Sequence, residues 1–172
     1  MKPKHSGFTL IELMITLALL AILLGIAVPA VRDFIVKQRV SSATNSLIMS
    51  LVFARSEAVK LNRDVRVIPA TTAANGWNNG WCLGPVTIGT DCNHADVIRV
   101  FSANNDVQIA SNTGSSPKID FRRDGTVNHP TDTALKITAD GLPANSESAR
   151  CIRVSSQGRP EVRHILPAAN CN

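Results

Sequence analysis

The chain has 172 residues, of which 44% are hydrophobic and 18% charged, enough for one modest domain and an appendage. These averages conceal a split, because a dense apolar run fills residues 8–28 and the remainder is polar. The formal net charge of +5 permits contact with nucleic acid or anionic lipid, but it is too small to argue for either by itself.

The apolar run, FTLIELMITLALLAILLGIAV, is long enough to cross a bilayer, which takes about 20 residues. Lys2 and Lys4 precede it, so the positive-inside bias places the N-terminus in the cytoplasm and the following domain outside. A conventional secretory signal is the alternative, kept open by small residues at Ala27 and Ala30. We therefore predict a membrane-spanning helix over residues 8–28.

Glu12 is the one ionised side chain inside this run. A carboxylate at the middle of a membrane helix costs about 3 kcal/mol, so it usually has a partner or a function. The alternative is a position near the membrane interface, where the cost falls.

The string GFTLIELMITLALLAILLGIAVP resembles the class III signal of type IV prepilins and type II secretion pseudopilins. The resemblance implies that residues 1–7 are a leader and that a prepilin peptidase cuts between Gly7 and Phe8 and methylates Phe8. Glu12 then stands where that family carries an acidic residue, which pairs with the free amine of a neighbouring subunit during assembly. Pro29 stands where pilins carry a helix-bending proline, which fits its loss of a backbone donor.

Beyond this point the pattern over residues 29–62 is that of an amphipathic helix. Residues with spacings of three and four form one face, namely Val40, Thr44, Leu47, Leu51, Ala54, Ala58 and Leu61. The charged residues fall mostly off it, namely Arg39, Arg55, Glu57, Lys60 and Arg63. We expect this face to pack on a sheet.

Residues 63–172 read as a β-rich globular domain. Extended runs lie at residues 65–70, 81–88, 97–101, 107–110, 118–123, 134–139 and 149–155, and a last one, EVRHIL, follows the turn sequence SSQGRP. Asp124-Gly125 is a second hairpin signal. The fold class predicted is α+β and pilin-like, with a long N-terminal helix, part transmembrane and part amphipathic, packed on an antiparallel sheet.

Four cysteines lie downstream of the apolar run, and an even number in an exported domain favours disulfides. We favour the local pairs Cys82–Cys92 and Cys151–Cys171, while the two other pairings stay open. A metal site built from Cys82, Cys92 and His94 lacks a C-x-x-C knuckle.

The sequence gives no support to the hypothesis that the protein is an enzyme. No motif places a nucleophile beside a base, and the glycine-rich stretches follow no strand-to-helix phosphate pattern. We therefore predict no catalytic residues, no metal and no cofactor.

Three downstream strings, ARSEAVKLNRDVRV, IDFRRDGTV and RCIRVSSQGRPEVR, resemble the FimT/FimU/GspH group of minor pilins and minor pseudopilins. The resemblance implies a minor pilin that takes part in type IV pilus assembly or priming at the bacterial inner membrane, single-pass with a periplasmic domain. Its partners would be other pilins, met through the N-terminal helix, and the prepilin peptidase. One alternative is a minor pseudopilin of a type II secretion system.

The other alternative is a DNA-binding minor pilin for natural transformation. FimT-type pilins of competent bacteria bind DNA through a C-terminal glycine-arginine motif, which Gly158, Arg159 and Arg163 resemble. In a strand the two arginines point to one face, where they would hold phosphate, although Glu161 lies between them. Their spacing of four is wider than the Gly-Arg-x-Arg pattern. Further basic residues would widen the patch if the sheet brings them together, namely Arg122, Arg123, Arg150 and Arg153.

Overall fold

The computed structural model describes residues 8–73, 76–103, 106–111, 118–127 and 134–171, and it leaves the side chains of residues 26–30 undescribed. The leader, including Gly7, lies outside the described residues. The chain forms two compact units, Met1–Ile35 and Val36–Asn172. We describe each by itself.

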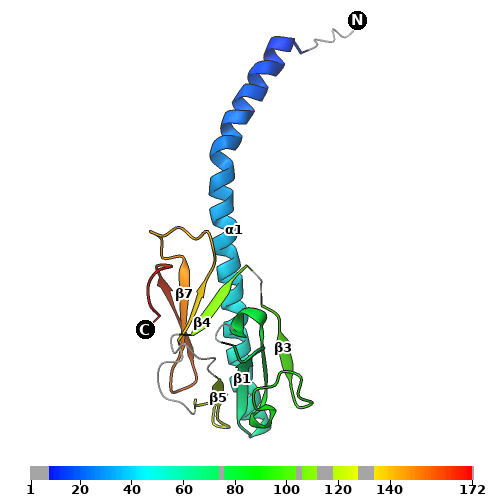
Figure 1. Ribbon diagram of the computed structural model, residues 1–172, viewed down its shortest axis with the longest axis vertical. Helices are drawn as coiled ribbons and strands as arrows, with labels where there is room; N and C mark the ends of the chain where they lie inside the picture. The colour runs from blue at the N-terminus through cyan, green and yellow to red at the C-terminus, as the bar shows by residue number, and fades with distance from the viewer. Residues whose placement is uncertain (1–7, 74–75, 104–105, 112–117, 128–133, 172) are drawn as a thin grey trace, which may run out of the picture. The chain divides into compact units, whose positions relative to one another are not determined.

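In the first unit the chain is helical from Leu10, the start of helix α1 (Leu10–Leu61) (Figure 1). All described side chains of residues 8–25 and 31–35 are exposed, and the Glu12 N–H donates to Oγ1 of Thr9 at 3.3 Å. The helix continues through Pro29. Among the residues described, no helix offers an apolar stretch long enough for a membrane crossing. The predicted span of residues 8–28 extends into the part whose side chains are undescribed.

In the second unit α1 buries the face that the sequence pattern predicts. Val40, Leu47, Leu51, Ala54 and Ala58 are fully buried, and Thr44 is nearly so. The Thr44 hydroxyl donates to the Val40 carbonyl at 2.7 Å, so its burial leaves no donor unmet. Leu61 is 37% exposed, so the buried face ends one turn earlier than predicted, at Ala58.

Each predicted extended run contains one strand, but the strands form two antiparallel sheets rather than one. The first sheet has the order β3-β2-β1-β5, with β3 at Arg99–Phe101, β2 at Trp81–Pro85, β1 at Val65–Pro69 and β5 at Ile119–Phe121. The second has the order β4-β6-β7-β8, with β4 at Gln108–Ser111, β6 at Ala134–Thr138, β7 at Ala149–Val154 and β8 at Pro160–Ile165. Short 3-10 helices cover Gly76–Asn79 and Val86–Ile88, so run 81–88 is strand only to Pro85.

β5 lies at the edge of the first sheet, next to β1. β5 joins β1, with Arg66 directly opposite Asp120. The Arg66 Nε donates to Asp120 Oδ1 at 2.6 Å and Nη2 donates to Oδ2 at 2.7 Å, a bidentate and partly buried pair. This bond raises the pKa of Arg66. Beyond β5, an isolated antiparallel bridge joins Phe121 to Val127.

One hydrophobic core joins the buried face of α1 to both sheets. Its largest members include Trp77, Trp81 and Phe121, and Trp81 stacks on Phe101 with ring centroids 5.9 Å apart. The Trp81 Nε1 donates to Oγ of Ser50 on α1 at 2.8 Å, which satisfies the indole inside the core.

Both disulfides are the local pairs that the sequence favours. Cys82 joins Cys92 and packs with Ile68 and Ile88 in a small cluster of its own. Cys151 on β7 joins Cys171 and packs with Ala134 and Ile165. The second bridge therefore fastens the C-terminal segment to the second sheet.

Helix α1 and two distant turns meet at one point, which we call the turn junction (Arg55, Gly125 and Gly158). The Arg55 Nε donates to the Gly125 carbonyl at 3.1 Å. The Val127 N–H donates to the Ser156 carbonyl at 3.1 Å, which links the two turns. Gly158 has φ of 72°, and a Cβ there would lie 2.1 Å from the Gly125 oxygen. Only glycine fits that position.

We predict that Gly158→Ala lowers the free energy of unfolding far more than Gly141→Ala. Both glycines have positive φ, but a Cβ at Gly141 meets nothing within 4 Å. Gly141→Ala therefore costs only the backbone strain, about 1–2 kcal/mol, whereas Gly158→Ala also displaces the Gly125 carbonyl and should cost at least about twice as much. Urea unfolding measures both, and equal losses would contradict the junction.

Candidate functional site

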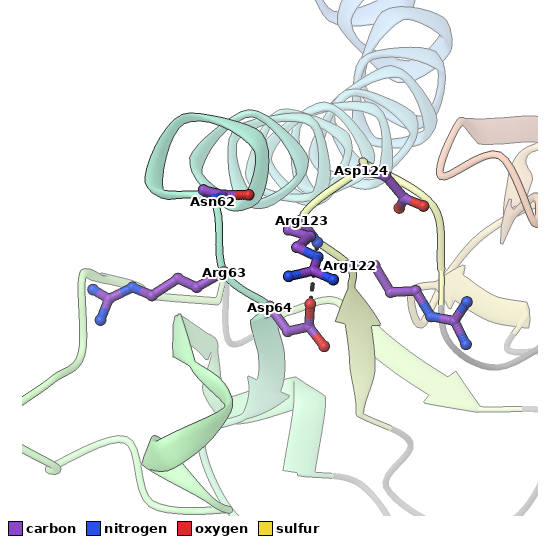
Figure 2. A pocket seen from close by; sticks show the side chains of 6 residues that line it. All are labelled: Asn62, Arg63, Asp64, Arg122, Arg123 and Asp124. Carbon is purple, nitrogen blue, oxygen red and sulfur yellow. Dashed lines mark hydrogen bonds between the residues drawn. The ribbon is translucent and has the colours of Figure 1, made fainter.

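A polar cavity of about 570 Å³ opens where α1 ends. Its lining is shown in Figure 2 and consists of Asn62, Arg63, Asp64, Arg122, Arg123 and Asp124. We call it the arginine pocket. It belongs to the second unit, and every side chain in the lining is polar.

The end of α1 forms the first wall through a helix-capping motif. Asn62 has φ of 50°, in the left-handed region that asparagine tolerates better than most residues. The Asn62 N–H donates to the Val59 carbonyl at 3.3 Å and the Arg63 N–H to the Ala58 carbonyl at 3.2 Å, the two bonds of a Schellman cap. The cap turns the chain from α1 into β1 and leaves Arg63 and Asp64 exposed at the corner.

The second wall is the tight turn after β5. The Arg122 N–H donates to the Thr126 carbonyl at 2.7 Å, and the Gly125 N–H donates to the Arg122 carbonyl at 2.8 Å. Asp124 Oδ1 accepts from the Thr126 hydroxyl at 2.6 Å and from the Thr126 N–H at 2.9 Å. Both hydrogen bonds lower the pKa of Asp124, and the bond from the Thr126 hydroxyl has the larger effect.

Both carboxylates of the pocket accept hydrogen bonds from backbone N–H groups. Asp64 Oδ1 accepts from the Arg123 N–H at 3.1 Å, which ties the end of α1 to the turn after β5. Asp124 caps its own turn in the same way. In Figure 2 the Arg63 and Arg122 side chains extend to opposite sides, with Arg123 between them. The pocket thus displays three exposed guanidiniums around two carboxylates that stabilise the backbone.

Arg159, predicted from the glycine-arginine resemblance, lies next to the turn junction. It follows Gly158 and closes the β7–β8 hairpin, because the Ser155 N–H donates to its carbonyl at 2.9 Å and its own N–H donates to Ser155 Oγ at 3.2 Å. Its side chain is exposed.

Arg163 lies further along β8, directly opposite Cys151 on β7. Glu161 lies between the two arginines along the strand and is opposite Arg153. A basic strip on β8 therefore includes an acidic residue.

Arg150, which the sequence suggested as an extension of the patch, forms hydrogen bonds with the backbone just before it in the chain. Its Nη1 donates to the carbonyls of Glu147, Ser148 and Ala149 at 3.0–3.2 Å, and burial lowers its pKa. The structure thus brings Arg122 and Arg123 together with Arg63, which was not among the residues predicted to form the basic patch. Arg63 lies just after the helix in ARSEAVKLNRDVRV, and only the pairing of β5 with β1 reveals its neighbours.

Within the described part of the chain, no three histidine, cysteine or acidic side chains come together to hold a metal ion. The arginine pocket contains no serine, cysteine or histidine that would act as a nucleophile or base. What it offers chemically is charge-assisted hydrogen bonding to anions.

Comparison with known proteins places this architecture in a family. Residues 43–158, well over half of the chain, match the family model described as Type II transport protein GspH. The chain belongs to the GspH family. Residues 2–28 also match the prokaryotic N-terminal methylation motif, as the prepilin-like string predicts.

Curated relatives match the GspH-family chain over shorter stretches. Fimbrial protein EcpC of Eikenella corrodens is 40% identical over 77 residues, which is 44% of this chain and 47% of that protein. Type IV major fimbrial protein FimA of Dichelobacter nodosus is 47% identical over 45 residues, or 26% and 28% of the two chains. The matched stretches thus span about half or less of these relatives.

Solved structures of the type IV minor pilin FimU of Pseudomonas aeruginosa share the fold. Two crystal forms align with TM-scores of 0.59 and 0.56 at 22% identity, covering 73% and 72% of this chain and 89% and 91% of theirs. This likeness confirms the predicted pilin fold, a long N-terminal helix packed on antiparallel sheet.

The lowered pKa of Asp124 gives a test of the pocket's second wall. The ionised carboxylate stabilises the fold above the ordinary carboxyl value of 3.8, and this contribution is lost as the pH falls through the lower folded-state pKa. Thr126→Val removes the hydroxyl hydrogen bond, which is the largest cause of the lowered pKa, so the Asp124 pKa should rise toward its ordinary value.

An NMR titration of the Asp124 carboxyl carbon measures this change. Thr138→Val is the matched control, because Thr138 lies on β6 in the second sheet, whereas β5 belongs to the first. An Asp124 midpoint that is the same in wild type and Thr126→Val would contradict the account.

Proposed function

We propose that this protein is a minor pilin that is inserted in the bacterial inner membrane and takes part in type IV pilus assembly or priming. One observation carries the proposal: a prokaryotic N-terminal methylation motif at residues 2–28 is joined to a GspH-family domain. The shared fold with a type IV minor pilin supports it.

The first unit has the chemistry that such a subunit needs. Its described apolar side chains are widely exposed, with Phe8 at 82% and Leu10 at 76%. An apolar surface of this kind needs a partner, lipid before assembly and the helices of other pilins afterwards. The domain that follows would then be periplasmic, with a single-pass helix as its anchor.

Glu12 gives the assembly step its register. It is the one charged side chain in residues 8–25, and it lies in the first turn of α1, where the helix dipole favours a carboxylate. After a prepilin peptidase cuts between Gly7 and Phe8 and methylates Phe8, the new amine of one subunit would pair with Glu12 of its neighbour. An ion pair surrounded by apolar helices adds little net stability, but a misplaced subunit would leave both charges unpaired.

A minor pseudopilin of a type II secretion system would use the same processing and the same helix. The description of the matched family, Type II transport protein GspH, favours this variant of the proposal. Deletion of the gene separates the two, because loss of pili with normal protein secretion supports the pilus, and the reverse supports the secretion system.

The processing and assembly steps predict different defects for two substitutions. Gly7→Val should block cleavage, so that the chain keeps its leader and Phe8 is not methylated. Glu12→Ala should be cleaved and methylated normally but should be missing from sheared filaments. Mass spectrometry of the N-terminus and immunoblots of the filament fraction measure the two steps.

Met14→Leu, a conservative change in the same helix, is the control and should be processed and assembled as wild type. If Gly7→Val were processed and assembled normally, or Glu12→Ala entered filaments at the wild-type level, the assembly proposal would be wrong.

DNA binding is a second candidate function, favoured by the gathering of exposed arginines near the turn junction. Arg122 and Arg123 line the pocket, and Arg159 follows the neighbouring turn. Guanidiniums bind phosphate by charge-assisted and bidentate hydrogen bonds. A full-length chain that fails to shift a DNA duplex at low salt would remove this candidate.

A further inference from the structure

The arginine pocket carries three exposed guanidiniums and two exposed carboxylates, and both carboxylates accept hydrogen bonds from backbone N–H groups. Arg63, Arg122 and Arg123 come from two segments that lie far apart in the sequence and are exposed. The carboxylates between them accept hydrogen bonds from the Arg123 and Thr126 amides. The lining therefore carries three positive and two negative charges, a net charge of +1.

We propose that this pocket, rather than strand β8, binds the phosphodiester backbone of DNA, with Arg63, Arg123 and Arg122 contacting different phosphates. The proposal rests on the candidate DNA-binding function and deepens it. It adds Arg63 to the surface and removes Arg163 from it.

The directions of the side chains favour a ligand with repeated charges over a single anion. A site for one phosphate or carboxylate would bring its donors together on one point. In Figure 2 Arg63 and Arg122 extend to opposite sides of the pocket and Arg123 lies between them. A row of separated guanidiniums matches a chain of phosphates, each neutralised by one arginine.

The composition of the lining disfavours a protein partner. Protein interfaces draw most of their binding energy from buried aromatic or apolar anchors and from fully desolvated arginines. The pocket is lined only by asparagine, arginine and aspartate, and its three guanidiniums are exposed. Contacts with the nucleic-acid backbone, in contrast, are mostly polar and come from side chains such as these and from backbone amides.

Strand β8 is the less suitable surface because its charges alternate. Glu161 separates Arg159 from Arg163 along the strand. Arg163 lies opposite Cys151, well inside the β7–β8 ladder and away from the hairpin turn that meets the junction. Arg159, at the end of that turn, is placed to extend the arginine pocket, whereas Arg163 is not.

The test uses the full-length chain in mild detergent and a short fluorescent DNA duplex, with anisotropy measured over a salt series. Three double variants each remove two positive charges: Arg63→Gln with Arg123→Gln, Arg159→Gln with Arg163→Gln, and Lys37→Gln with Lys136→Gln as the matched control. The Arg63/Arg123 variant should lose affinity about tenfold or more at low salt, and its plot of log K against log salt should lose about 0.9 in slope per arginine. The control should stay near wild type.

Each other outcome overturns the proposal in a recognisable way. If wild type does not bind, the DNA function and this inference fall together, while the assembly proposal stands. If only the Arg159/Arg163 variant loses affinity, DNA binding stands and the pocket is excluded. An equal loss in the lysine control means that net charge alone acts. Competition by polyglutamate as strong as that by DNA indicates an acidic protein partner, and competition by inorganic phosphate indicates a single-anion site.

Discussion

The hydrogen bond from the Arg55 Nε to the Gly125 carbonyl is the constraint on which the second unit and its pocket depend. It joins the C-terminal part of a long helix to a turn 70 residues away, and Gly158 packs against the same carbonyl from a third segment. The three strings that resemble minor pilins, ARSEAVKLNRDVRV, IDFRRDGTV and RCIRVSSQGRPEVR, each supply one member of this contact. Their association in one protein therefore has a physical reason, since each string completes the junction that the other two begin.

The two units separate two kinds of chemistry. The first is an exposed apolar helix with Glu12 as its one charge over residues 8–25, which is suited to ordered association in a non-aqueous setting. The second has a buried hydrophobic core shared by α1 and both sheets and contains two disulfides, as suits a domain in an oxidising compartment. Its arginine pocket lies on the corner that the helix cap and the turn after β5 form together.

Local patterns predicted the elements of the fold well. The period of three and four identified the buried face from Val40 to Ala58, extended runs identified the strands of the described residues, and short loops identified both disulfides. Long-range pairing was not predictable in the same way. The sequence suggested one sheet, whereas the strands form two, and the bidentate Arg66–Asp120 pair joins β5 to β1 in the first. Arg55 falls off the apolar face, so the helical pattern predicts no contact for it, yet its partner is a backbone carbonyl, which no side-chain pattern reveals. Arg63 also falls off the apolar face, and its place beside Arg122 and Arg123 depends on the pairing of β5 with β1.

The most direct test of the central claim is a double-mutant cycle between Arg55→Met and Gly158→Ala, measured as free energies of unfolding in urea. If Arg55 and Gly158 act on the same carbonyl, the alanine methyl already breaks the Arg55 hydrogen bond, and the second substitution should cost less than it does alone. The account predicts a coupling energy of about 1 kcal/mol or more, with Gly141→Ala in place of Gly158→Ala giving simple additivity. If the losses in free energy of unfolding for Arg55→Met and Gly158→Ala add to within about 0.5 kcal/mol, the account is contradicted.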